Sequence, residues 1–128
     1  MKLEGLKVID LSVFLPGPYL TLAMADHGAD VIKVEPPGGD PGREIGLSDG
    51  PHTVVFRLLT RGKKSIMLDL KTDAAREALL RLCEDADVFV ESFRPGVTDR
   101  LGVGWEALRR RNPRIVYCSI SAFGQDGP

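Results

Sequence analysis

The chain alternates between short, mostly apolar runs and longer stretches in which apolar residues recur every three or four positions. Short runs of apolar, β-branched or aromatic residues are typical of strands that are buried on both faces of a parallel sheet. Stretches with a repeat near 3.6 are typical of helices with one buried side. The pattern predicts five strands, at residues 6–12, 30–35, 66–70, 88–90 and 115–120.

A helix is predicted between the first two strands, over the apolar residues 19–27. It follows Pro16-Gly17-Pro18, and Pro18 suits the first helical turn because an N–H group there would have no partner within the helix. Gly28 comes directly after the helix, and glycine is the preferred residue in the left-handed conformation that ends many helices. This segment therefore predicts a strand–turn–helix unit.

Two more helices are predicted from spacing and end signals. In the first, apolar residues at i, i+3, i+4, i+7 and i+8 form one buried stripe, with a cap at Thr72 or Asp73. The stripe consists of Ala75, Ala78, Leu79, Leu82 and Cys83. The second covers residues 105–111 and is ended by Asn112-Pro113. Residues 53–60 fit either a short helix or a buried strand, and helix is preferred.

The alternation of strands and helices predicts an α/β fold. Right-handed crossovers between strands would give a Rossmann-like, mostly parallel sheet with helices on both faces. The 128 residues correspond to one domain, residues 1–128. Residues 36–50 are rich in Pro, Gly and Asp, which predicts a surface loop of a length that is often functional.

Composition argues against several kinds of partner. Seventeen Lys and Arg against eighteen Asp and Glu give a net charge of −1, so no overall positive field would attract nucleic acid or an anionic membrane. No run has the length of a signal or membrane-spanning segment, which favours a soluble, cytoplasmic protein. Cys83 and Cys118 lack the paired spacing of a metal or redox site, so we expect no metal and two buried thiols.

Two arginines follow the strand predicted at residues 88–90. The turn at Pro95-Gly96 makes Arg94 and Arg100 leave the sheet near the carboxyl end of that strand. Ligands of open α/β sheets bind at this edge. Two guanidinium groups there predict an anionic ligand.

The strand predicted at residues 66–70 has cations at both ends. Arg61, Lys63 and Lys64 precede it, and Lys71 follows it directly. The plainer interpretation is that Lys71 and Arg100 are solvated charges near helix ends.

Four segments, in this order along the chain, resemble family III CoA-transferases, the group that also contains α-methylacyl-CoA racemases. They are LEGLKVIDLS at residues 3–12, DVIKVEPPGGDPGR at 30–43, TRGKKSIMLDLKT at 60–72 and ESFRPGVTDRLG at 91–102. The resemblance implies an enzyme that moves CoA between an acyl-CoA and a carboxylic acid through an aspartyl intermediate. It also implies coenzyme A or acyl-CoA as substrate, with no tightly bound cofactor.

The resemblance also implies which residues contact coenzyme A. They lie in the first strand–helix turn and after the third and fourth predicted strands: Leu15, Pro16, Leu68, Lys71, Ser92, Phe93, Arg94 and Arg100. Several relatives have an arginine against adenine at the position of Pro36, and Arg43 in the following loop is a candidate to replace it.

No catalytic residue is expected in this chain, because the family's nucleophilic aspartate and the His/Asp pair of the racemases lie beyond the segment that residues 121–128 resemble. We therefore expect an incomplete, amino-terminal part that is inactive alone. Family III enzymes form interlocked homodimers. This chain is expected to be a monomer or a loosely associated dimer with exposed apolar surface.

Three alternatives remain at this point. One is an α-methylacyl-CoA racemase of the same family, and another is a non-catalytic CoA- or nucleotide-binding module. The third is part of a nicotinamide dehydrogenase, with Glu35 holding a ribose. It ranks last because residues 12–20 contain only Gly17 and form no glycine-rich turn.

Other polar residues are assigned structural roles. Arg109, Arg110 and Arg111 are expected on a solvated helix face that pairs with Glu106. We expect His27 at a helix end and His52 in a loop, without catalytic roles. Asp10, Asp69 and Asp126 are expected to form caps or turns.

Overall fold

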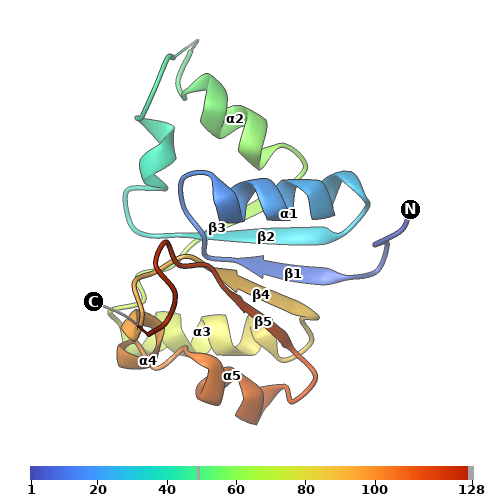
Figure 1. The fold of residues 1–128 in the computed structure, drawn as a ribbon, viewed down its shortest axis with the longest axis vertical. Coiled ribbons are helices and arrows are strands. Elements are labelled where there is room, and N and C mark those ends of the chain that lie inside the picture. Colours follow the sequence, from blue (N-terminus) through green and yellow to red (C-terminus); the bar gives the residue numbers. More distant parts are fainter. Residues whose placement is uncertain (49, 127–128) are drawn as a thin grey trace.

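The structure is a computed structural model that describes residues 1–48 and 50–126 (Figure 1). Its centre is a five-stranded sheet in which every strand pairing is parallel. The strands lie in the order β3-β2-β1-β4-β5, so the predicted Rossmann-like α/β fold is confirmed. Their bounds are β1 (Lys7–Asp10), β2 (Asp30–Glu35), β3 (Lys64–Met67), β4 (Val88–Glu91) and β5 (Val116–Ser119).

The helices cover the sheet on both sides (Figure 1). Helix α1 lies on one face, and α3 and α5 lie side by side on the other. The bounds are α1 (Pro16–Asp26), the 3₁₀ turn η1 (Pro41–Arg43), α2 (Val54–Thr60), α3 (Asp73–Cys83), α4 (Val97–Arg100) and α5 (Trp105–Arg111). None of the helices in the described residues is long and apolar enough to cross a membrane.

The alternation of side chains along β1 explains why the core has two parts. Val8 packs with Val31 and Val90 in the cluster on the α1 side. Its neighbour Ile9 packs with Phe89 in the larger cluster that contains residues of α3 and α5. Successive residues of a strand point to opposite faces, so a strand buried on both sides carries apolar residues towards both faces. This is the pattern that predicted the strands.

The order of the sheet places a topological switch beside β1. The chain proceeds from β1 to β2 and β3 on one side, then returns to β4 and β5 on the other. The register pairs Asp10 with both Lys33 and Val90, so β1, β2 and β4 end close to the same level. The segments that follow these strands therefore meet at one edge, where open α/β sheets bind ligands.

The third strand begins and ends earlier than predicted. Residues 66–70 were expected, but β3 is Lys64–Met67. It is an edge strand with exposed Lys64 and Ser65, so apolarity does not mark its beginning. The strand is followed by a turn in which Lys71 N donates to the Asp69 carboxylate. Asp69 thus has the predicted turn role.

Helix α1 begins at Pro16, three residues before the predicted start, so Pro16 and Pro18 both lie in its first turn. Gly28 follows the helix with φ of 100°, the left-handed conformation that was predicted. Helix α2 resolves the ambiguity of residues 53–60 in favour of helix, capped by the Thr53 side chain. The single-turn helix α4 after Gly96 was not predicted.

Candidate functional site

An open cleft of about 610 Å³ lies at the carboxyl edge of the sheet. We call it the strand-end cleft. Its walls come from the ends of β1, β2, β3 and β4 and from the segments that follow them. They include Val13, Pro36, Leu68, Lys71 and Phe93. The cleft therefore occupies the position that the strand order predicts for a ligand.

The walls of the cleft are largely apolar, and its rim carries a positive charge. Leu68, Leu70, Phe93 and Leu101 are half-buried and provide carbon surface. Lys71 is exposed and forms no ion pair within residues 1–48 and 50–126. An apolar wall beside a free ammonium group suits a ligand that combines a flat aromatic ring with phosphate.

The structure brings together three of the eight predicted contact residues, because Leu68, Lys71 and Phe93 all line this cleft. Ser92 lies behind the wall: its Oγ accepts a hydrogen bond of 3.0 Å from the backbone N–H of Val13. Ser92 thus ties the end of β4 to the turn that follows β1.

The other four predicted residues lie outside the cleft. Leu15 lines a separate pocket, described below, and Pro16 is an exposed residue at the start of α1. Arg94 lines two smaller cavities beside the segment that follows β5. Arg100 is exposed at the end of α4. Like Lys71, the two arginines form no ion pair within the described residues.

The basic run of α5 is different, because two of its three arginines, Arg109 and Arg111, have carboxylate partners. Arg109 lies 3.0 Å from Glu106, as predicted. Arg111 pairs with Glu77 of α3 at 2.7 Å and with Glu84 at 2.9 Å. This surface is a helix face with ion pairs, as the spacing indicated.

A buried ion pair supports the turn between β1 and α1. Lys63 Nζ lies 3.1 Å from Asp10 Oδ2, and both side chains are almost fully buried. Asp10 also accepts hydrogen bonds from Thr21 Oγ1 at 2.5 Å and from both the N–H and the hydroxyl of Ser12. Burial alone would raise the pKa of Asp10, but Lys63, Lys33 and the two hydroxyls outweigh it and lower that pKa.

The turn role predicted for Asp10 is confirmed, because the backbone N–H of Ser12 donates to its carboxylate. Its pairing with the buried Lys63 was not predicted. Position in the sequence did not distinguish Lys63 from Lys64, whose side chain is 68% exposed.

A second set of ion pairs fixes the loop that follows β2. Lys33 Nζ lies 2.7 Å from Asp40 Oδ2 and donates to the Ser12 carbonyl at 2.8 Å. Glu35, at the end of β2, binds Arg43 through both carboxylate oxygens. The hydrogen bonds from Arg43, together with those from Ser65 and Asp40, lower the pKa of Glu35 to about 2.

These contacts bear on two of the sequence-based interpretations. Glu35 is engaged by Arg43 and is 2% exposed, so it is not placed to hold a ribose as a dehydrogenase would require. The guanidinium of Arg43 is also engaged, since its carbon lies 4.4 Å from the centre of the Phe56 ring. A contact between Arg43 and adenine stays a prediction.

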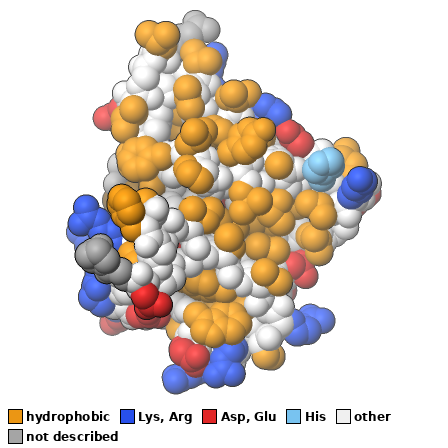
Figure 2. All heavy atoms as spheres, in the orientation of Figure 1, with side chains coloured by type: hydrophobic (Ala, Val, Ile, Leu, Met, Phe, Trp, Pro, Cys, Tyr) orange, Lys and Arg blue, Asp and Glu red, His pale blue; other side chains and the backbone are white. Residues whose placement is uncertain are grey.

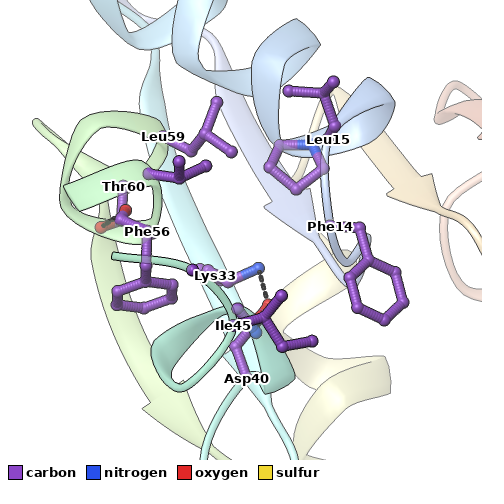
Figure 3. Close-up of a pocket in the computed structure, with 12 residues that line it drawn as sticks. Phe14, Leu15, Lys33, Asp40, Ile45, Phe56, Leu59 and Thr60 are labelled. Carbon is purple, nitrogen blue, oxygen red and sulfur yellow. Dashed lines mark hydrogen bonds and ion pairs between the residues drawn. The ribbon is translucent and has the colours of Figure 1, made fainter. Parts of the chain in front are cut away.

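A second pocket, of about 350 Å³, lies between α2 and the turn after β1. We call it the α2 pocket. Figure 3 shows Phe14 and Leu15 on one side and Phe56, Leu59 and Thr60 of α2 on the other. No sequence pattern indicated this pocket, because its walls combine residues from the turn after β1, from β2, from the loop that follows β2 and from α2.

Phe14, between β1 and α1, adopts a backbone conformation that is unusual for its type. Its φ is 65°, and it is the only non-glycine residue with a positive φ in the part of the chain that the structure describes. A bulky residue in this conformation is strained by about 1–2 kcal/mol. Such residues cluster at functional sites, and sequence patterns do not identify them.

Exposed apolar side chains surround the α2 pocket. Figure 2 shows hydrophobic side chains gathered over the face on which α1 and α2 lie in Figure 1. They include Phe14, Tyr19, Val55 and Leu58, each at least half exposed. The expected apolar surface is present, and the association state of the chain stays a prediction.

Comparison with known proteins identifies relatives over nearly the whole chain. The model of a family described as CoA-transferase family III matches residues 3–128. An acetyl-CoA:oxalate CoA-transferase of Acetobacter aceti is 48% identical over 98% of this chain. A probable fatty acyl-CoA transferase of Mycobacterium tuberculosis, Rv3272, is 43% identical over 98% of this chain. The aligned regions are 32% and 33% of these relatives, so the chain spans about a third of their length.

Solved structures share the same arrangement. The crystal structure of Rv3272 matches with a TM-score of 0.91 and 42% identity, over 98% of this chain and 35% of that chain. A CAIB/BAIF family protein from Brucella suis matches with a TM-score of 0.92 and 42% identity, over the same shares. The fold described above is therefore also found in these proteins.

Proposed function

The chain belongs to CoA-transferase family III, and from this membership we propose that it forms the CoA-binding, amino-terminal part of an enzyme. That enzyme would transfer CoA from an acyl-CoA to a carboxylic acid. The observation that carries the proposal is the strand-end cleft, in which apolar walls from Leu68 and Phe93 adjoin the free ammonium group of Lys71.

The ligand's chemistry matches the cleft. Coenzyme A has an adenine ring, which needs an apolar face, and phosphate groups, which need fixed cations or backbone N–H groups. In our proposal adenine packs against the apolar wall, and Lys71 and Arg100 contact phosphate. Leu15, Pro16, Ser92 and Arg94 complete the proposed contacts along the edge of the sheet.

The reaction would proceed by covalent catalysis. An aspartate carboxylate attacks the thioester carbonyl of acyl-CoA, the carbon–sulfur bond breaks, and CoA leaves as a thiolate. A mixed anhydride remains on the aspartate. The thiolate then attacks the aspartyl carbonyl of this anhydride, which releases the donor acid and leaves CoA as an aspartyl thioester. The acceptor carboxylate attacks that thioester and expels the thiolate, which then attacks the acceptor carbonyl of the second anhydride to give the new acyl-CoA and restore the aspartate. We assign no residue of this chain to the nucleophile and propose that the chain alone binds CoA without turning it over.

Calorimetric titration of the purified chain with CoA tests the proposal. Lys71→Ala and Arg100→Ala should each weaken binding about tenfold, because each removes a charge-assisted contact to phosphate. Arg109→Ala is the matched control, since Arg109 lies on α5 and pairs with Glu106. Dephospho-CoA should bind more weakly than CoA, and NAD should not bind.

Two outcomes would overturn the proposal. One is an absence of CoA binding. The other is CoA binding that Arg109→Ala weakens as much as Lys71→Ala does, because a general dependence on positive charge would not locate the ligand at the strand-end cleft.

A further inference from the structure

The strand-end cleft and the α2 pocket are separated by two short pieces of chain. Val13 lines the cleft, while the next two residues, Phe14 and Leu15, line the pocket. Likewise Pro41 lines the cleft, while Gly42 lines the pocket. A ligand in the cleft therefore needs to extend only past these turns to reach the pocket.

The inner wall of the α2 pocket offers no free charge. Lys33 and Asp40 both line it, but they pair with each other at 2.7 Å and are 2% and 4% exposed (Figure 3). No other Lys, Arg or His lines this pocket among the residues described. A carboxylate that entered would lose its hydration without gaining a cationic partner, which is costly.

The rest of the wall is hydrocarbon and aromatic. Ile45 comes from the loop after β2, Val55 and Leu59 come from α2, and Phe14 and Leu15 come from the turn. Ile45 and Val55 are more than half exposed, so they lie at an accessible part of the pocket. An apolar ligand group that packs against this wall leaves water, and this makes binding more favourable.

The conformation of Phe14 is a separate observation that points to the same place. Its positive φ sets the direction of the turn at the point where the lining changes from cleft to pocket. Backbone strain of this kind persists only where the surrounding structure enforces it, and it is concentrated at ligand sites.

We propose that the α2 pocket binds the acyl group of an acyl-CoA whose nucleotide part occupies the strand-end cleft, and that it selects hydrocarbon acyl groups over those with a terminal carboxylate. The inference rests on the proposed CoA site and adds the substrate class. Under this proposal the chain binds acyl-CoA with a hydrocarbon acyl group in preference to the dicarboxylic acyl-CoA of the same length.

Three ligands of matched chemistry test the selection: CoA, hexanoyl-CoA and adipoyl-CoA. The two thioesters have six acyl carbons and differ in the terminal carboxylate. Each methylene group that the pocket buries should strengthen binding about fourfold. We expect hexanoyl-CoA to bind at least tenfold more tightly than CoA, and adipoyl-CoA to bind no more tightly than CoA.

Two neighbouring valines of α2 provide the variant and its control. Val54 and Val55 are 46% and 51% exposed, and only Val55 lines the pocket. Val55→Asp should remove most of the difference in affinity between hexanoyl-CoA and CoA, because the new carboxylate lies in the α2 pocket. The affinity for CoA itself should stay within about twofold, because CoA has no acyl group to place there. Val54→Asp should leave both affinities within about twofold, because its side chain is outside the pocket.

The possible failures are distinguishable. If CoA binds in the manner described but hexanoyl-CoA binds no more tightly, or adipoyl-CoA binds equally well, the acyl selection is wrong and the CoA site stands. Equal effects of Val54→Asp and Val55→Asp would also overturn the pocket assignment. If none of the three ligands binds, both proposals are wrong.

Discussion

Arg43 donates hydrogen bonds of 2.7 Å to each carboxylate oxygen of Glu35, from Nε to Oε2 and from Nη2 to Oε1. This bidentate pair joins the loop after β2 to the end of the strand itself. The backbone N–H of Asp40 donates to the same carboxylate at 2.8 Å. The loop that carries Ile45 to the α2 pocket is therefore held in place by an acid at the carboxyl edge of the sheet.

The ion pair between Glu35 and Arg43 should make the free energy of unfolding depend on pH in the acid range. The folded-state pKa of Glu35 is about 2, below its ordinary value of 4.5. Its contribution is therefore complete above pH 4.5 and is lost as the pH falls towards 2, by about 3 kcal/mol in total. The free energy of unfolding of the native chain should fall more steeply over this interval than that of Glu35→Gln, as urea titrations at pH 7, 4.5 and 3 would measure.

The prediction is tested by comparing the native chain with Glu35→Gln at each pH. Their difference in unfolding free energy should shrink by about 2 kcal/mol between pH 4.5 and pH 3. Glu106→Gln, at an exposed ion pair, is the control and should follow the native chain. A difference that stays constant with pH would mean that Glu35 is not the titrating group.

Two adjacent lysines should differ sharply in their contribution to stability. Lys63 is 1% exposed and pairs with fully buried Asp10, so Lys63→Met leaves a buried carboxylate without its cation and should cost about 3 kcal/mol. Lys64 pairs with Asp30 at 2.7 Å, but the two side chains are 68% and 48% exposed. Lys64→Met should therefore change the unfolding free energy by less than about 1 kcal/mol.

Urea unfolding of both variants at pH 7 measures this contrast. Similar losses in the two would contradict the assignment of Lys63 to the buried pair. If Lys63→Met fails to fold while Lys64→Met remains stable, the loss of unfolding free energy has the predicted direction and is larger than predicted.

The elements of this fold could be predicted because their signals are local. A strand buried on both faces is mostly apolar, and this pattern identified β2 with the observed bounds, β4 to within one residue and β1 to within two. Helix α5 was also predicted with the correct bounds, since Asn112-Pro113 ends it. The strand β3 was shifted because an edge strand tolerates polar residues.

The candidate site could be predicted only in part, because it depends on contacts between distant segments. The resemblance to a known family led to Leu68, Lys71 and Phe93, which share the strand-end cleft. It gave no sign of the α2 pocket or of the strain at Phe14. Nothing local to Lys63 indicates that it pairs with Asp10, 53 positions away.

The two cysteines were both predicted to be buried, and the structure corrects one of them. Cys83 is 0% exposed, and burial raises the pKa of its thiol to about 12. Cys118 is only half-buried, because it lies on β5 at the edge of the sheet, and burial also raises the pKa of its thiol. Since the thiolate is the reactive form, Cys83 should react about a thousandfold more slowly than an ordinary thiol at pH 8.

Labelling with a chromogenic disulfide reagent at pH 8 measures the difference. In the native chain we expect one thiol to react slowly, and two to react rapidly in denaturing urea. The native variant Cys118→Ala should remain unlabelled over the same period. Rapid native labelling of that variant would show that Cys83 is accessible and that the α3 side of the core opens readily.

The strain at Phe14 predicts an inverted preference between alanine and glycine. At most positions glycine is the less stable of the two, because it has more conformational freedom to lose on folding. At φ of 65°, the Cβ atom of alanine is itself unfavourable. Phe14→Gly should therefore unfold with a free energy about 0.5 to 1 kcal/mol higher than Phe14→Ala.

A helical position gives the opposite sign and serves as the control. Ala23 is exposed within α1, so Ala23→Gly should lower the unfolding free energy by about 1 kcal/mol. Urea titrations of the three variants and the native chain provide all the comparisons. If Phe14→Gly were the less stable of the Phe14 pair, the turn would have to relax freely in the variants. The conformation at the boundary between the cleft and the α2 pocket would then not be enforced by its surroundings.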